Sequence, residues 1–377
     1  MSMTRRDLMK TLGVAGVAVA AAGTAASTLA ATSAKKSLKI LFIGGSGFIG
    51  PHMVRRAQAR GHEVTLFNRG KTNPHLFPEV EKLVGDRDGG LAVLEGRDWD
   101  AVIDTSGYVP RVVRDSAELL QDRVKRYLFI STGDVYADFV KVGLDEDYTL
   151  DTIADPTNED PSKFYGPLKV LCEKAVSETY GQRSTILRPG WIIGSGDYNS
   201  ISSYWPMRIN HGGEVLAPGH PDDPVQIIDA HDLAVFVIKL LEKDISGIYN
   251  TMGPESPLTW AEFLYGCRAV TSSKVKFTWV PADFLAKQGV SAMTDMPIWF
   301  PPLDDYPTPA PFEPGAKGFH QMSAQRAIDT GLTFRPLALT AKSIIKEYMA
   351  RDEDWVSTPR RFGVSLEREA ELLKAFG

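Results

Sequence analysis

Cysteine is almost absent from this chain of 377 residues. Only Cys172 and Cys267 occur, and no Cys-x-x-Cys pair exists. Two cysteines cannot build a disulfide framework or an all-cysteine metal site. The seven histidines are scattered without the spacing of metal ligands, so the sequence predicts no metal site.

An excess of positive charge is also missing. The chain has 42 Lys and Arg residues against 47 Asp and Glu residues, which gives a net charge of −5. A surface of this charge has no bulk electrostatic attraction for nucleic acid or anionic lipid. The hydrophobic fraction of 43% is that of ordinary globular proteins and excludes a disordered chain.

No charged residue occurs between positions 11 and 34. Arg5 and Arg6 precede this weakly apolar run, which is rich in Ala and Gly and ends in small residues. A basic start, an apolar run and small residues are typical of an export signal, and adjacent arginines resemble the twin-arginine signal. We therefore expect residues 1–34 to be cleaved and the protein to be periplasmic or secreted. The alternative is an uncleaved helix, because the run is long enough to span a membrane.

A glycine-rich turn follows the first predicted strand. Residues 37–43 are apolar and short, as in a buried parallel strand, and residues 51–62 have the pattern of a helix. Between them lie Gly44, Gly47 and Gly50. Glycines let the backbone approach a pyrophosphate, whose charge then lies at the helix N-terminus. This order predicts the first βαβ unit of a dinucleotide-binding fold.

The end of the next predicted strand, 62–67, bears on the choice of cofactor. NAD sites usually carry an acidic residue at this point, which accepts from the ribose 2′-hydroxyl. Asn68 and Arg69 stand there instead. A guanidinium group suits a 2′-phosphate, so the sequence favours NADP, with NAD as the alternative.

Further strands alternate with helical stretches along the chain. The strands are expected at 81–86, 101–104, 127–130 and 184–187. This alternation predicts an α/β fold with a doubly wound parallel Rossmann sheet, whose ligands bind at the carboxyl ends of the strands. We expect the Rossmann domain over 35–190 with a return segment at 222–250. A smaller substrate-binding domain is then expected from 191–221 and 251–377.

Thr132, Tyr165 and Lys169 are the candidate catalytic residues. Thr132 follows a predicted strand, while Tyr165 and Lys169 lie on one face at the start of a helix predicted to reach about residue 180. A phenol has a pKa near 10, and a neighbouring cation favours the phenolate. Tyr165 could then exchange a proton with an alcohol or carbonyl during hydride transfer, while Thr132 orients the reacting oxygen.

The motifs ILFIGGSGFIG, LFISTGDVY, YGPLK, LRPGWIIGSGD and DAHDLA resemble extended short-chain dehydrogenases/reductases of the NAD-dependent epimerase/dehydratase group. The resemblance covers most of residues 37–346. It implies catalytic roles for Thr132, Tyr165 and Lys169, the last two also touching the cofactor. The other implied cofactor contacts are Gly44, Gly47, Phe48, Ile49, Gly50, Asp86, Arg87, Thr105, Ser106, Pro189 and Gly190.

Two departures from the family pattern stand out. Ile43 occupies the position where the family usually has Thr, and the acidic residue after the second strand is missing. The stretch FNRGK (67–71) resembles an atypical subgroup that includes plastid RNA-binding relatives. The resemblance therefore implies the fold more firmly than the reaction.

The second half of the chain offers two substrate candidates. Trp205 could stack on a ring and Arg208 could meet a carboxylate or phosphate, although core packing and a surface charge are the alternatives. Residues 297–318 hold seven prolines and are expected to form a loop or lid.

Together these features predict a hydride-transfer enzyme that uses NAD(P) and acts on a hydroxyl or carbonyl of a sugar-like or other small substrate. Export as a folded protein suits a cofactor that is oxidised and reduced again within one turnover, as in an epimerase or dehydratase. A simple NADP-dependent reductase and a non-catalytic nucleotide-binding protein are the alternatives. The expected partners are a small-molecule substrate and the twin-arginine export machinery, with no nucleic acid, and a homodimer remains open.

Overall fold

The computed structural model describes residues 36–197, 201–302, 316–351, 353–358 and 360–377. The expected export signal, residues 1–34, lies outside the described residues, as does most of the proline-rich loop. None of the helices in the described ranges is both long and apolar enough to cross a membrane.

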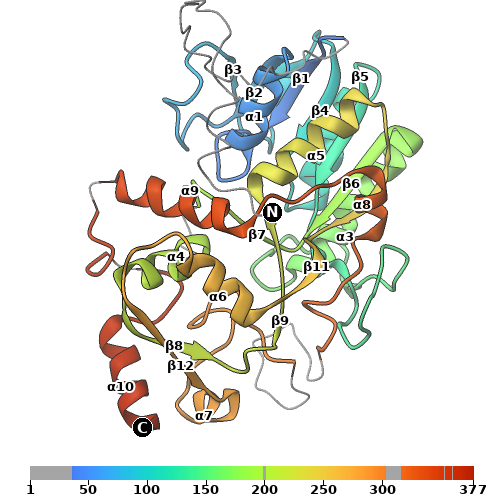
Figure 1. The fold of residues 1–377 in the computed structure, drawn as a ribbon. Coiled ribbons are helices and arrows are strands. Elements are labelled where there is room, and N and C mark those ends of the chain that lie inside the picture. Colours follow the sequence, from blue (N-terminus) through green and yellow to red (C-terminus); the bar gives the residue numbers. More distant parts are fainter. Residues whose placement is uncertain (1–35, 198–200, 303–315, 352, 359) are drawn as a thin grey trace, which may run out of the picture. The chain divides into compact units, whose positions relative to one another are not determined.

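Seven strands form a central sheet in the order β10-β6-β5-β4-β1-β2-β3 (Figure 1). They are β1 (Lys39–Ile43), β2 (Glu63–Asn68), β3 (Glu81–Val84), β4 (Trp99–Asp104), β5 (Val124–Ile130), β6 (Ser184–Pro189) and β10 (Gly247–Thr251). All neighbouring pairs are parallel. The chain runs outward from β1 in one direction and from β4 in the other, so the predicted doubly wound α/β fold is confirmed.

Helices cover both faces of this sheet because its strands are apolar on both sides. Side chains alternate along β1: Ile40 and Phe42 pack with α1 (Gly50–Ala59) and α5 (Ala230–Glu242). Leu41 and Ile43 face the opposite side, where α2 (Pro110–Leu120) and α3 (Tyr165–Tyr180) lie. Short 3₁₀ turns complete this part: η1 (Leu91–Leu94), η2 (Gly133–Val135) and η3 (Gly181–Arg183).

The second half of the chain adds two small sheets, β11-β9-β7 and β12-β8 (Figure 1). Their strands are β7 (Trp191–Ile193), β8 (Gly213–Pro218), β9 (Pro224–Asp229), β11 (Gly253–Thr259) and β12 (Val275–Val280). The helices are α4 (Ile201–His211), α6 (Trp260–Arg268), α7 (Ala282–Lys287), α8 (Gln325–Thr330), α9 (Leu337–Met349) and α10 (Leu366–Phe376). Residues 222–250 run from β9 through α5 to β10, the edge strand of the large sheet.

The prediction that Trp205 and Arg208 contact substrate is wrong. Trp205 is fully buried within α4, and its indole N–H donates to the carbonyl oxygen of Pro297 at 2.6 Å. Arg208 is buried as well and forms an ion pair with Glu369 of α10. Residues 202–209 of α4 are all buried, so both side chains lie inside the core of the second half.

Candidate active site

The glycine-rich turn between β1 and α1 is shaped by its neighbours. Gly44 has φ +105°, and a Cβ there would lie 2.4 Å from the Thr105 hydroxyl oxygen. A Cβ on Gly50 would lie 2.5 Å from the backbone of Gly45. A Cβ on Gly47, by contrast, would meet no atom within 4 Å. The first two glycines are therefore required for packing, while Gly47 borders open space.

The same turn can receive an anion. In the described part of the chain, the backbone N–H groups of Ser46, Gly47 and Phe48 have no hydrogen-bond acceptor. They precede the N-terminus of α1, where unsatisfied donors and the helix dipole favour negative charge. Free donors beside an open Gly47 fit the pyrophosphate of a dinucleotide.

Hydroxyls from the end of β4 hold the turn in place. Thr105 Oγ1 and Ser106 Oγ both donate to the Ile43 carbonyl oxygen, at 3.2 and 3.3 Å. Thr105 Oγ1 also accepts from the Gly45 N–H at 3.4 Å. These side chains lie at the point where the strand order reverses, the usual ligand-binding position of such sheets.

Asn68 and Arg69 differ in their environment. The Asn68 amide donates to the Gly44 carbonyl oxygen at 3.0 Å and accepts from the Gly70 N–H at 2.9 Å. Its side chain therefore braces the glycine-rich turn. Arg69 is exposed at the end of β2, so its guanidinium is accessible at the place where a ribose would be distinguished.

The structure corrects the cofactor contact that the resemblance implied for the Arg87 side chain. Its guanidinium points into the protein and pairs with both oxygens of Asp104, at 2.8 and 2.6 Å. Ser116 and Tyr127 add further hydrogen bonds. Asp104 is fully buried at the end of β4, and a buried carboxylate requires a cation. The Asp86 side chain remains exposed.

Thr132 and Tyr165 are brought together where the start of α3 meets η2. Thr132 follows β5 and caps η2, since its hydroxyl oxygen accepts from the Asp134 N–H at 3.2 Å. Tyr165 opens α3, and its phenol lies near the Thr132 hydroxyl. A Cβ on Gly166 would lie 2.2 Å from the Asp134 carbonyl oxygen, so this glycine lets α3 begin directly against η2.

Lys169 lies one turn further along α3 and is buried. Its ammonium donates to the carbonyl oxygens of Gly107 and Ile130, at 2.9 and 2.7 Å. It also lies over the Phe129 ring, 4.2 Å from the centroid. Burial lowers the pKa of Lys169 to about 8. The exposed ring of Tyr108 lies 5.5 Å from this ammonium and 6.4 Å from the Tyr165 ring.

Asp134 was not singled out from the sequence. Its carboxyl group lies beside Thr132 and is partly buried, and the loss of solvent raises its pKa to about 6. None of the ion pairs in the described ranges includes it. The pKa of Tyr165 is raised first by burial and then by the negative charge of Asp134. The sequence signal that could have identified Asp134 is its position two residues after Thr132, the hydroxyl residue at the end of the predicted strand.

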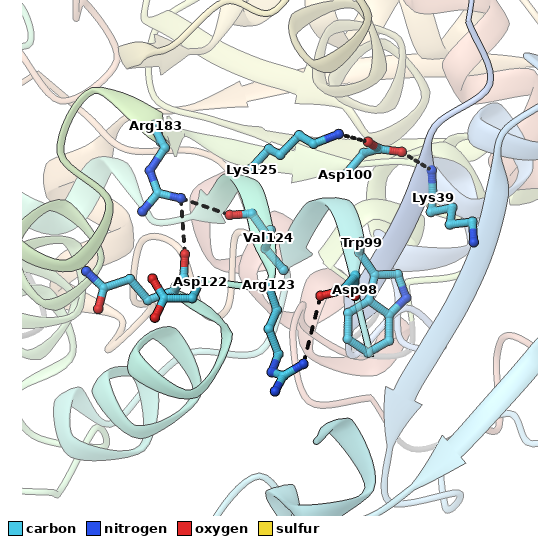
Figure 2. Close-up of a pocket in the computed structure, with 10 residues that line it drawn as sticks. Lys39, Asp98, Trp99, Asp100, Asp122, Arg123, Val124, Lys125 and Arg183 are labelled. Carbon is cyan, nitrogen blue, oxygen red and sulfur yellow. Dashed lines mark hydrogen bonds and ion pairs between the residues drawn. The ribbon is translucent and has the colours of Figure 1, made fainter. Parts of the chain in front are cut away.

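A surface pocket at the opposite ends of the strands carries charged side chains but no comparable arrangement (Figure 2). Lys125 pairs with Asp100 at 2.7 Å, and Arg123 lies 3.9 Å from Asp98. These pairs lie near the amino ends of β4 and β5, away from Thr132. Across the described residues, no three His, Cys, Asp or Glu side chains are placed to hold a metal ion.

The two cysteines are buried and free. Burial raises the pKa of both Cys172 and Cys267 to about 12, so neither thiol is an activated nucleophile.

Comparison with known proteins gives a consistent result. Residues 40–251 match the model of the NAD-dependent epimerase/dehydratase family. The chain is 27% identical over 239 residues to chloroplast stem-loop binding protein of 41 kDa b from Arabidopsis thaliana, across 59% of this chain and 60% of that protein. It is 26% identical over 276 residues to epimerase family protein SDR39U1 from Bos taurus, across 67% of this chain and 86% of that protein.

Solved structures share the fold. The Bordetella bronchiseptica enzyme WbmH in complex with NAD+ matches with a TM-score of 0.59 and 14% identity, across 84% of this chain and 100% of that chain. Human epimerase family protein SDR39U1 (isoform 2) with NADPH matches with a TM-score of 0.55 and 20% identity, across 82% and 99%. At these identities the likeness shows the fold alone.

Proposed function

The chain belongs to the NAD-dependent epimerase/dehydratase family, and we propose that it is an enzyme transferring hydride between a bound nicotinamide dinucleotide and a substrate hydroxyl or carbonyl. The observation that carries this proposal is the position of Tyr165 near Thr132, at the carboxyl edge of the sheet that also holds the open turn at Gly47. A proton-transfer pair and a dinucleotide cradle on one sheet edge are the two parts that this chemistry requires.

The bound dinucleotide would accept or return the hydride. The Thr132 hydroxyl would orient the substrate oxygen, and the Tyr165 phenol would give a proton to a carbonyl or take one from an alcohol. Lys169 is fixed by two main-chain carbonyl oxygens and a ring face, so its charge stands at a defined place one helical turn from Tyr165. Its positive charge would favour the phenolate during alcohol oxidation.

We infer that NADP is the preferred cofactor. Arg69 is accessible at the end of β2, while the Asn68 amide is already bonded to Gly44 and Gly70. Arg69 is thus the charged residue of these two, and its positive charge suits a 2′-phosphate. Relatives of this fold have been solved with NADPH and with NAD+, and both cofactors therefore belong in the test.

We further propose that residues 1–34 export the folded protein with its cofactor, and that the reaction is of the epimerase or dehydratase type. Adjacent Arg5 and Arg6 before an uncharged run support the export signal. A cofactor regenerated within each turnover needs no soluble supply outside the cytoplasm. Stem-loop binding, which the name of the chloroplast relative gives, is not extended to this chain, because the net charge is −5.

The proposal is tested with Tyr165→Phe. Native mass spectrometry of the purified full chain should detect bound NADP(H), and the variant should retain it. The single-turnover hydride half-reaction, in which NADPH in the loaded protein reduces a carbonyl from a panel of aldehydes and ketones, should slow by about 100-fold or more, since a positioned acid–base group contributes that much. The matched control is Tyr265→Phe, an exposed tyrosine on α6. Equal turnover in Tyr165→Phe and the wild type would refute the role of this phenol.

A further inference from the structure

We infer that Tyr108 is a positioning residue for Lys169, because the rings of Tyr108 and Phe129 form an aromatic cage that keeps the Lys169 ammonium away from water. This inference rests on the proposed hydride-transfer function and adds a residue to it. Tyr108 lies outside the motifs from which the catalytic residues were predicted. Three features carry the inference: the contacts of the ammonium, the charges around it, and the loop that places Tyr108.

Two carbonyl oxygens and two aromatic rings enclose the Lys169 ammonium. It donates to the carbonyl oxygens of Gly107 and Ile130, at 2.9 and 2.7 Å. The centroid of the Phe129 ring lies 4.2 Å from the ammonium nitrogen, and that of the Tyr108 ring lies 5.5 Å from it. Both distances are within the range of cation–π interactions. The ammonium is therefore held by backbone dipoles and ring faces.

The two rings of the cage differ in their exposure. Phe129 is fully buried, whereas Tyr108 is 46% exposed. Lys169 itself is only 3% exposed. The Phe129 ring thus closes the cage towards the protein interior, and the Tyr108 ring closes it towards the solvent. Removal of the Tyr108 ring would let water reach the ammonium.

The ammonium has no carboxylate to neutralise it. Among the residues that the structure describes, none of the ion pairs includes Lys169. The acidic and basic groups whose charges act on it are already paired with a partner. These pairs are Arg87–Asp104 and Arg188–Glu173. The Cys172 thiol and the Tyr165 phenol are neutral, because burial raises the pKa of both groups. A buried cation in such surroundings depends on dipoles and ring faces for its stabilisation.

The loop after β4 brings Tyr108 to this position. A Cβ on Gly107 would lie 2.5 Å from Phe129 Cε2 and 2.7 Å from Val113 Cγ2. The glycine therefore lets the loop backbone pack directly on the Phe129 ring, where its carbonyl oxygen reaches Lys169. Because α2 begins at Pro110, only one residue separates Tyr108 from this helix. The residue after Gly107 is thus held beside the ammonium.

The cage borders the phenol of the proposed proton transfer. The Tyr108 ring lies 6.4 Å from the Tyr165 ring. A cation that is kept from water acts more strongly on a neighbouring phenol, because the effective dielectric constant is low. Burial is the largest cause of the lowered pKa of Lys169, which is about 8. Opening the cage should therefore raise this pKa and weaken the effect of Lys169 on Tyr165.

The test is an NMR comparison of the purified full chain and its variants, labelled with ¹³C,¹⁵N-lysine. The Lys169 signals are assigned by their loss in Lys169→Arg. In the wild type at about pH 6, where the ammonium is protonated, its hydrogens should exchange slowly with water. Tyr108→Ala should accelerate this exchange about tenfold or more and move the titration midpoint of Lys169 towards the usual pKa of about 10.4. Tyr108→Phe keeps the ring and should restore slow exchange and the low midpoint.

The matched control is Tyr265→Ala, which removes an exposed tyrosine from α6 and should leave the Lys169 signals unchanged. The second readout is the single-turnover hydride half-reaction, which should slow about tenfold in Tyr108→Ala and recover most of its rate in Tyr108→Phe. Unchanged exchange in Tyr108→Ala, equal acceleration in Tyr108→Phe, or an unslowed half-reaction in Tyr108→Ala would overturn the assignment.

Failure of the hydride-transfer function is seen separately, as absence of nucleotide binding or as an unslowed half-reaction in Tyr165→Phe. The NMR comparison requires neither nucleotide nor turnover. It therefore decides whether Tyr108 encloses Lys169 even where the proposed reaction fails.

Discussion

Asp134 places a partly buried negative charge beside the phenol on which the proposed proton transfer depends. Burial raises the pKa of this carboxyl to about 6, so it is ionised at neutral pH. The anion disfavours the phenolate and, together with burial, raises the pKa of Tyr165. Asp134 therefore opposes the ionisation of Tyr165 that alcohol oxidation needs. Removing the Asp134 charge should lower the pKa of Tyr165.

Asp134→Asn should shift the pH profile of alcohol oxidation. Without the carboxylate the pKa of Tyr165 falls, so the limb of kcat/KM that rises with pH should move to lower pH by about one pH unit. The measurement is kcat/KM against pH for both proteins. Asp98→Asn, an exposed carboxylate at the other end of the sheet, should leave the profile in place. An unmoved limb in Asp134→Asn would show that this charge does not act on Tyr165.

The roles of two arginines could not be predicted from the sequence. The family resemblance implied a cofactor contact for Arg87, and Arg208 was a candidate for binding an anionic substrate group, yet both neutralise buried carboxylates. The Arg208 partner, Glu369, is 161 residues away in the sequence. A sequence pattern cannot distinguish an arginine that binds a ligand from one that pairs with a carboxylate of the protein. The reason is that the partner depends on tertiary packing.

At the scale of elements, the contact between η2 and α3 sets the distance between Thr132 and Tyr165. Gly166 allows that contact, since an added Cβ would lie 2.2 Å from the Asp134 carbonyl oxygen. Backbone cannot move aside as a flexible side chain can, so α3 would have to shift away from η2.

Gly166→Ala should therefore impair the reaction more than the fold. We expect a loss of kcat of about 100-fold, because small displacements of catalytic groups have large effects on rate. The far-ultraviolet circular dichroism spectrum and retained NADP(H) should resemble those of the wild type. Lys174→Ala, an exposed change on the same helix, is the control. A Gly166→Ala enzyme with wild-type kcat would contradict the proposed importance of this contact.

Six of the seven strands of the large sheet were predicted, and the edge strand β10 was not. The strands expected at 37–43, 62–67 and 127–130 occur as β1, β2 and β5, because short apolar runs in a βαβ order leave few alternatives. The two small sheets were not predicted. β12 pairs with β8, which lies about sixty residues earlier, and β9 pairs with both β7 and β11. Such long-range pairing leaves no local sequence pattern.

At the scale of the whole molecule, cofactor binding should stabilise the fold. The proposed cradle joins residues after β1 and β2 to residues after β5, so a bound dinucleotide links distant parts of one sheet. A ligand at a concentration of 100 times its Kd stabilises a protein by about 2.7 kcal/mol.

NADP should raise the Tm more than NAD does at equal concentration. Arg69→Asp should reverse that order, because the carboxylate would repel a 2′-phosphate and accept from a 2′-hydroxyl. Differential scanning fluorimetry with each nucleotide gives the comparison. Arg97→Asp, an exposed change outside the proposed cradle, should not alter the order. Equal effects of NADP and NAD on the wild type would contradict the preference for NADP.

Export is the last property of the whole molecule that can be tested directly. The twin-arginine pathway reads adjacent arginines, and the conservative change to lysine keeps the positive charge that other export routes use. The double variant Arg5→Lys, Arg6→Lys, expressed in a bacterium with a twin-arginine system, should leave the protein in the cytoplasm. The control is Lys10→Arg, which keeps both arginines and the net charge. Immunoblots of cytoplasmic and periplasmic fractions distinguish the outcomes. Periplasmic accumulation of the double variant at the wild-type level would exclude this route, and with it the reason to expect a cofactor carried out inside the folded protein.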